Sequence, residues 1–173
     1  MYIELKTPRL LLRPLGLQDI RTTHLYASDV ENTKYMLFLP NLSLEETRIF
    51  LSHVEEEWKK DVPSVYEFAV VYQQEHIGAI SLGIVDFKMA EIGWILRKDY
   101  WNKGYITEAA EAIKQFAKSH LHLTTLIAHC DSQNIASQRV MEKIHMVRLN
   151  QTSFRKNKLS SLPSIEWTYQ LSL

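Results

Sequence analysis

The segment from Asn102 to Thr107, with the sequence NKGYIT, has the composition of a helix start that can bind an anion. Apolar residues recur at helical spacing from Ile106 onward, which predicts a helix. The amides of a first helical turn have no partner within the helix and lie at the positive end of its dipole. Gly104 has no side chain to obstruct a ligand, and Lys103 adds a positive charge. These residue types suit a phosphate group, and a diphosphate is the ligand we expect.

One glycine does not by itself identify the ligand of this segment. A dinucleotide-binding turn carries three glycines and a P-loop carries G-x-x-x-x-G-K-[ST], and neither pattern occurs in the chain. From these residues alone, an ordinary strand-to-helix turn is an equal alternative.

Three further side chains have types suited to proton transfer or hydrogen bonding. Glu91 begins an alternating apolar segment, Glu91 to Arg97, that predicts a strand; a solvated carboxylate is the alternative to a catalytic one. Asn134 and Ser137 are three residues apart on a predicted helix and share one face. Helix capping is the alternative role for Asn134, and it is compatible with ligand binding.

His129 and Cys130 are neighbours on a predicted strand, so their side chains point to opposite faces and cannot easily act as a base and a nucleophile. We expect Cys130 to be buried or to line a slot. His120 and His122 are too few for a metal site and lack further ligands at suitable spacing. We therefore expect no metal.

The elements that must position these residues predict a mixed α/β domain. A short polar connection joins two apolar segments into a hairpin, and the strand from Glu91 follows closely, so these three strands are antiparallel neighbours. The strand ending at Cys130 comes after a helix and should run parallel to Glu91–Arg97. The expected strands are Arg9–Arg13, Val65–Tyr72, Ile77–Asp86, Glu91–Arg97, Leu123–Cys130, Val147–Phe154 and Ile165–Leu171, the last two as partners, and the expected helices begin at Leu17, Ser43, Gly104 and Asn134.

The 173 residues suit a single domain, 1–173, which can bury roughly 70% of its unfolded surface. Twenty Lys and Arg balance 20 Asp and Glu, so overall charge gives no reason to expect nucleic acid or a membrane as a partner. A single Cys cannot form an internal disulfide, and we expect a cytoplasmic protein. No apolar run approaches the ~20 residues of a membrane span, and the first ten residues lack the apolar core of a signal peptide.

Three blocks of the chain resemble one protein family. They are TPRLLLRPL (Thr7–Leu15), AEIGWIL followed by YWNKGYITEA, and AHCDSQNIASQRVMEKIHM (Ala128–Met146). In these blocks and in their order the chain is similar to the GCN5-related N-acetyltransferases (GNAT), especially the branch of ribosomal-protein alanine and serine N-acetyltransferases. The resemblance covers nearly the whole chain. It implies the GNAT fold, with about seven mostly antiparallel strands, one splayed parallel pair and about four flanking helices.

The resemblance implies acetyl-coenzyme A as the cosubstrate. Its pantetheine arm would enter a slot between the two splayed strands, with Trp94 and Leu96 as slot residues; packing in the core is the alternative for both. Asn134 would hydrogen-bond to a pantetheine amide. The diphosphate would bind at the helix start, to Asn102, Lys103, Gly104, Tyr105, Ile106 and Thr107.

The resemblance also implies catalytic roles for Glu91 and Ser137. A free α-amino group has a pKa of about 8 and must lose a proton before it attacks a thioester. Glu91 would remove this proton, directly or through a water, and Ser137 would protonate or hydrogen-bond the departing thiolate. Whether Glu91, a water or another residue is the base stays open.

The phosphate-binding segment departs from the family pattern Q/R-x-x-G-x-G/A. Trp101 stands first, Ile106 stands last, and Asn102 replaces a frequent glycine. Backbone binding survives if the torsions allow it, because Asn tolerates left-handed geometry better than most residues. His145 stands where a glycine usually closes the helix that begins at Asn134.

With this resemblance, we expect an N-acetyltransferase that transfers acetyl from acetyl-coenzyme A directly to a primary amine. The first choice of acceptor is a protein N-terminal α-amine of ribosomal-protein type. The alternatives are a small-molecule amine, such as a polyamine or an amino sugar, or a non-catalytic acyl-coenzyme A sensor or interaction module. The expected partners are acetyl-coenzyme A and the amine acceptor, while the acceptor's identity, a homo-oligomeric state and the biological role stay open.

Overall fold

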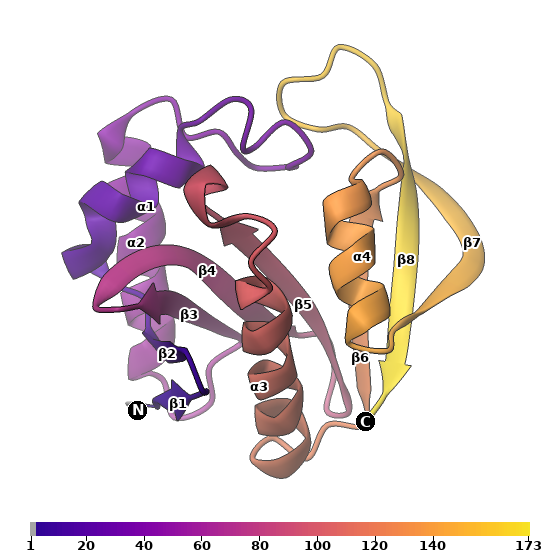
Figure 1. Ribbon diagram of the computed structural model, residues 1–173, viewed down its shortest axis with the longest axis horizontal. Coiled ribbons are helices and arrows are strands. Elements are labelled where there is room, and N and C mark those ends of the chain that lie inside the picture. The colour runs from indigo at the N-terminus through magenta and orange to yellow at the C-terminus, as the bar shows by residue number, and fades with distance from the viewer. Residues whose placement is uncertain (1–2) are drawn as a thin grey trace.

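Eight strands form one sheet across the part of the chain that the computed structural model describes, residues 3–173 without the side chains of positions 151 and 152. The strand order is β1-β2-β3-β4-β5-β6-β8-β7, and only β5 and β6 pair in parallel (Figure 1). The strands are β1 Leu5–Lys6, β2 Leu10–Pro14, β3 Val65–Tyr72, β4 Glu75–Ile84, β5 Met89–Leu96, β6 Thr125–Asp131, β7 Val147–Arg155 and β8 Ser164–Ser172, and the α-helices are α1 Ile20–Ala27, α2 Leu44–Lys59, α3 Tyr105–Ser119 and α4 Ile135–Lys143. The predicted mixed fold with one parallel pair and four helices is confirmed.

Helix α2 begins where its sequence predicts. The Oγ of Ser43 accepts a hydrogen bond from the Glu46 amide at 3.2 Å, and the Glu46 carboxylate accepts one from the Leu42 amide at 2.9 Å. These bonds satisfy amides at the helix start that have no partner inside the helix. Helix α2 lies beside α1 (Figure 1), where His24 and Thr47 share a hydrogen bond of 2.9 Å.

Aromatic side chains of α2 and α3 meet in the core against β3. The ring of Phe116 on α3 lies 5.5 Å from that of Tyr66 and 5.7 Å from that of Phe68, measured between ring centres. Trp58 on α2 lies 5.1 Å from the ring of Phe68. Edge-to-face packing of this kind stabilises beyond the area it buries, so α3 is held firmly against the sheet.

Helix α3 connects β5 to β6, as a parallel pair requires. The two strands then pair over only part of their length. β5 continues to Leu96 and β6 to Asp131 with no pairing after Glu91. The pairs that form are Met89–Thr125, Ala90–Leu126 and Glu91–Ile127. The strands therefore part after Glu91, as expected of a splayed pair, and leave backbone N–H and C=O groups on both edges available to a ligand.

The C-terminal strands pair as predicted, but β8 and not β7 lies next to β6. β7 is therefore the outer edge of the sheet (Figure 1).

Within residues 3–173, no helix combines the length and the apolar character needed to cross a membrane.

Candidate functional site

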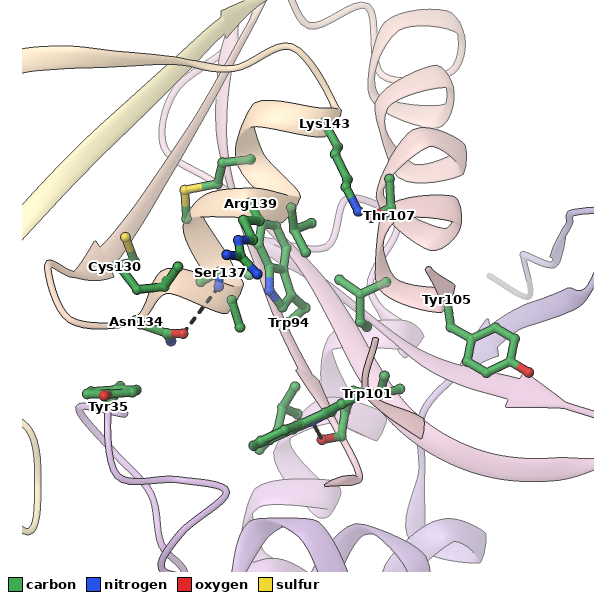
Figure 2. Close-up of a pocket in the computed structure, with 18 of the residues that line it drawn as sticks. Tyr35, Trp94, Trp101, Tyr105, Thr107, Cys130, Asn134, Ser137, Arg139 and Lys143 are labelled. Atoms are coloured by element: carbon green, nitrogen blue, oxygen red, sulfur yellow. Dashed lines mark hydrogen bonds between the residues drawn. The ribbon is translucent and has the colours of Figure 1, made fainter. Parts of the chain in front are cut away.

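A cavity of about 430 Å³ lies where β5 and β6 part. It is bounded by the second half of β5, the start of α3, the end of β6, α4, the α1–α2 loop and Arg155 (Figure 2). All the predicted site residues except Glu91 and Lys103 line it, namely Trp94, Leu96, Asn102, Gly104, Tyr105, Ile106, Thr107, Asn134 and Ser137. The fold thus brings together residues from separate blocks of the sequence.

The start of α3 has the geometry expected of an anion site. Gly104 is the N-cap residue with φ of +78°, a left-handed conformation that glycine adopts without strain. The Glu108 amide donates to the Gly104 carbonyl at 3.0 Å, which leaves the three preceding amides without a partner inside the helix. A Cβ built on Gly104 would meet only the Arg9 guanidinium, at 3.5 Å. The approach to these amides is therefore open to a phosphate group.

Two departures from the family pattern fall on left-handed backbone. Asn102 has φ of +60° before α3, and His145 has φ of +68° after α4. Both positions suit glycine, and Asn and His are among the other residues that adopt this conformation most often. Asn102 therefore adopts the left-handed backbone that a glycine would adopt at this position.

Arg9 belongs to this site, although sequence reasoning missed it. Its Nε lies 2.6 Å from the Glu108 carboxylate, and one Nη donates to the Lys103 carbonyl at 3.0 Å. Its guanidinium carbon lies 4.6 Å from the centre of the Tyr105 ring. Arg9 holds the N-terminal segment against the start of α3, and its place in the block TPRLLLRPL was the available signal.

The side chains of Lys103 and Tyr105 point away from the cavity. The Lys103 ammonium donates to the Asp99 carbonyl at 2.8 Å and lies 5.2 Å from the centre of the Tyr100 ring. The Tyr105 ring projects outward (Figure 2) and packs on Tyr72 with ring centres 4.7 Å apart. These residues can therefore serve an anion through their backbone and not through their side chains.

Helix α4 forms the opposite wall of the cavity. Asn134 Oδ1 accepts a hydrogen bond from the Ser137 amide at 3.2 Å, so Asn134 caps the helix as its alternative role predicts. Arg139 and Lys143, four residues apart, also line the cavity, and Lys143 extends toward Thr107 at the start of α3 (Figure 2). Sequence reasoning missed both cations, because they lie two and six residues after Ser137, a spacing that does not place them on the same helix face as Ser137.

On β5, Trp94 and Leu96 line the cavity and also pack in the core. Leu96 is 7% exposed and Trp94 is half-buried. The Trp101 indole donates to the Leu96 carbonyl at 2.8 Å, so it fastens the loop before α3 to the end of β5. Both residues therefore line the cavity and pack in the core, and their contact with a pantetheine arm stays a prediction.

Glu91 lies just outside the cavity. It is exposed, it is the last β5 residue to pair with β6, and its carboxylate has no hydrogen bond or ion pair within the described residues.

His129 on β6 does line the cavity. Its Nδ1 lies 3.1 Å from the Thr168 hydroxyl and 3.8 Å from the Glu166 carboxylate, while Nε2 has no partner in the part of the chain that the structure describes. His129 is thus a titratable group at the site that sequence reasoning set aside.

Cys130 is buried and lines the cavity, as expected. Burial raises the pKa of its thiol to about 11, so the thiol stays protonated near neutral pH. A protonated thiol is a poor nucleophile. Cys130 therefore shapes the cavity wall.

Two loops that lie far apart in the sequence meet over the cavity. Arg155, whose side chain is 8% exposed, donates to the Tyr35 carbonyl and to the Glu166 carboxylate, each at 3.1 Å. The Lys158 amide donates to the Met36 carbonyl at 2.9 Å. The α1–α2 loop and the β7–β8 loop are therefore joined on one side of the opening, at the top of Figure 1.

Comparison with known proteins gives the family. Residues 9–147 match the acetyltransferase (GNAT) domain. The chain is similar to the uncharacterized N-acetyltransferase YnaD of Bacillus subtilis (strain 168), with 32% identity over 153 residues that cover 84% of each protein.

Solved structures agree with this match. A GNAT-family acetyltransferase from Bacillus anthracis superimposes with a TM-score of 0.83 at 29% identity, covering 98% of both chains. RimL, a ribosomal-protein alpha-N-acetyltransferase in complex with coenzyme A, gives a TM-score of 0.87 at 17% identity, covering 99% of this chain and 98% of that one; this likeness shows the shared fold alone. The chain therefore belongs to the GNAT family of acetyltransferases.

Proposed function

We propose that the chain transfers acetyl from acetyl-coenzyme A directly to a primary amine, and that the acceptor is a protein N-terminal α-amine of ribosomal-protein type. One observation carries the proposal. β5 and β6 part beside the start of α3, so an anion site and two unpaired strand edges open into a single cavity. A ligand with a diphosphate and an amide-bearing arm fits both features, and acetyl-coenzyme A has both.

The residues of the cavity suit the parts of this cosubstrate. The amides at the start of α3 would hold the diphosphate, and Gly104 allows its close approach. Trp94 and Asn134 flank the space for the arm from β5 and α4. Lys143 supplies positive charge from α4 on the side that faces α3 (Figure 2), and Arg139 of the same helix also lines the cavity.

Acetyl transfer requires the amine nitrogen to lose a proton and the leaving sulfur to gain one. Ser137 lines the cavity and is the proposed hydrogen-bond donor to the sulfur. Glu91 is the proposed base, and it would act through a water because its carboxylate lies outside the cavity lining. His129 is the competing base, because its free Nε2 belongs to a residue that lines the cavity.

The surface around the cavity favours a protein acceptor over a small amine. The α1–α2 and β7–β8 loops that meet there expose large apolar side chains, among them Phe38, Leu42 and Leu162, each more than 70% exposed. Exposed apolar groups on a loop that lines the cavity, and on the loop bonded to it, suit the flanking residues of a polypeptide. RimL, which has the same fold, is named for acetylation of a ribosomal protein.

The test is acetyl-coenzyme A turnover with N-terminal peptides, polyamines and amino sugars. Peptides are expected to give the highest kcat/KM, and a small amine that exceeds every peptide would overturn the acceptor assignment. Glu91→Gln should lower kcat roughly 10²-fold with unchanged acetyl-coenzyme A affinity, and the rate should partly recover at high pH, where free amine is abundant.

Ser137→Ala should lower kcat without that recovery, because alkali does not replace a hydroxyl donor. If Glu91→Gln matches the wild type at every pH while His129→Gln shows the alkaline recovery, His129 is the base.

A further inference from the structure

Asn32, on the loop between α1 and α2, lines the cavity. Its Oδ1 is the one buried side-chain nitrogen or oxygen without a hydrogen-bond partner in the described part of the chain. Leaving such a group unpaired costs about 1–3 kcal/mol. Buried polar groups are nearly always paired, so this oxygen calls for a partner that binds in the cavity.

The rest of the Asn32 side chain is fixed in place. Its Nδ2 donates to the Tyr26 carbonyl at 3.1 Å, and its backbone amide donates to the Asp29 carboxylate at 3.0 Å. A carbonyl can only accept, so Tyr26 determines that the nitrogen faces it and that Oδ1 faces the other way. Asp29 lies 2.8 Å from the Lys98 ammonium, which ties this loop to the end of β5. The oxygen is thus preorganised before any ligand arrives.

We propose that Asn32 Oδ1 holds the acceptor through one of the acceptor's N–H groups, an inference that rests on the proposed function. An amide oxygen accepts a hydrogen bond from an ammonium, amine or amide N–H and disfavours carboxylate and phosphate oxygens. The ligand class at this point is therefore an N–H donor.

Two molecules that share this chemistry enter the proposed reaction, the acceptor and the pantetheine arm. Asn32 lines the cavity together with Tyr35 and Met36 of the same loop, whereas the residues that suit acetyl-coenzyme A come from β5, α3 and α4. The position of Asn32 assigns it to the acceptor.

The test compares Asn32→Leu with Asn41→Leu. Asn41 lies on the same loop, is 7% exposed, donates from Nδ2 to the Thr47 hydroxyl at 3.0 Å and does not line the cavity. Asn32→Leu should raise the acceptor KM roughly tenfold, the effect of losing one hydrogen bond of about 1.4 kcal/mol, with no change in acetyl-coenzyme A Kd. Asn41→Leu should lower the Tm and leave the acceptor KM unchanged.

Asn32→Asp keeps an oxygen acceptor but loses the bond from Nδ2 to the Tyr26 carbonyl that orients it, so its acceptor KM should rise less than that of Asn32→Leu. An unchanged acceptor KM in Asn32→Leu, or a raised acetyl-coenzyme A Kd, would overturn the inference while the proposed function stands.

If the wild type acetylates no amine, the proposed function fails. The Tm values of Asn32→Leu and Asn41→Leu then test whether Asn32 Oδ1 lacks a partner in the free protein. Asn32→Leu should then lower the Tm no more than Asn41→Leu does, because each variant loses one hydrogen bond donated by Nδ2, to the Tyr26 carbonyl or to the Thr47 hydroxyl. A fall clearly larger than that of Asn41→Leu would overturn the inference, because it would show that the oxygen already has a partner.

Discussion

The two sides of β5 differ in how far they are paired. Toward β4, seven residue pairs run from Ala90 to Leu96, and toward β6, only three pairs form before the strands part. We call the pairing of β5 with β4, from Ala90 to Leu96, the closed seam. We call the edge of β5 that faces β6 beyond Glu91 the open seam. The closed seam satisfies the backbone and holds the sheet together, while the open seam leaves backbone groups and a cavity for a ligand. One strand thus serves as scaffold on one side and as binding site on the other.

Two glycines allow this difference to be tested. A Cβ on Gly78, in the closed seam, would lie 2.3 Å from the Ile95 carbonyl oxygen, whereas a Cβ on Gly93, beside the open seam, would meet only the Ser81 hydroxyl at 3.1 Å. Gly78→Ala should destabilise the fold by about 3 kcal/mol, because the backbone of β5 cannot yield. Gly93→Ala should cost under about 1 kcal/mol and act mainly on turnover, because Gly93 lines the cavity.

Denaturant unfolding and turnover of both variants measure this contrast. Equal losses of stability would remove the distinction between the closed and the open seam.

Gly104→Val should weaken acetyl-coenzyme A binding by roughly thirtyfold, or about 2 kcal/mol. A branched side chain strains the left-handed backbone and blocks the approach of a phosphate to the helix amides. Gly104→Asn is the matched control, because Asn tolerates the same backbone conformation. Calorimetry that finds equal affinity for wild type and Gly104→Val would remove the diphosphate from this helix start.

Much of the fold could be predicted because its signals are local. Alternating apolar residues revealed β5 and β8, an apolar segment revealed β3, and the spacing of Ser43 and Glu46 marked the start of α2. The position of β8 between β6 and β7 could not be predicted, because either strand of a hairpin can pair with β6 without changing the pattern of apolar residues. The two-residue strand β1 is too short to carry a periodic signal.

Some residues of the candidate site could likewise be predicted from local motifs, and others could not. Gly104 and Asn134 lie in motifs whose chemistry can be read along the chain, and both line the cavity. Arg9 reaches the site through an ion pair with Glu108, 99 residues away. Asn32 has an oxygen that is unpaired only because of how its loop folds against Tyr26. Contacts between distant segments of this kind have no signature in the local sequence.

A smaller effect on stability is expected at Glu67, on β3, a strand that pairs with β2 on one side and β4 on the other. Desolvation raises the pKa of its carboxyl to about 8 from an ordinary value of 4.5, and the carboxyl lies close enough to the Tyr26 phenol of α1 to interact with it electrostatically. The folded state therefore holds this proton more tightly than the unfolded state does. The stability that the protonated carboxyl contributes is fully present below about pH 4.5 and is lost as the pH rises to about 8.

Glu67→Gln stays neutral, so its Tm relative to the wild type should be higher by a few degrees at pH 8 than at pH 5. Thermal unfolding at the two pH values measures the difference. An identical offset at both would mean that Glu67 titrates normally in the folded protein.

The central claim is that the open seam and the start of α3 together bind acetyl-coenzyme A. Amide hydrogen exchange with and without acetyl-coenzyme A tests it most directly. We predict slower exchange on binding in residues 92–96, 104–107 and 128–131, with little change in β3 and in the first half of β4, whose backbone groups are already paired. Protection that is absent from these three segments, or spread evenly over β3 and β4, would contradict the account.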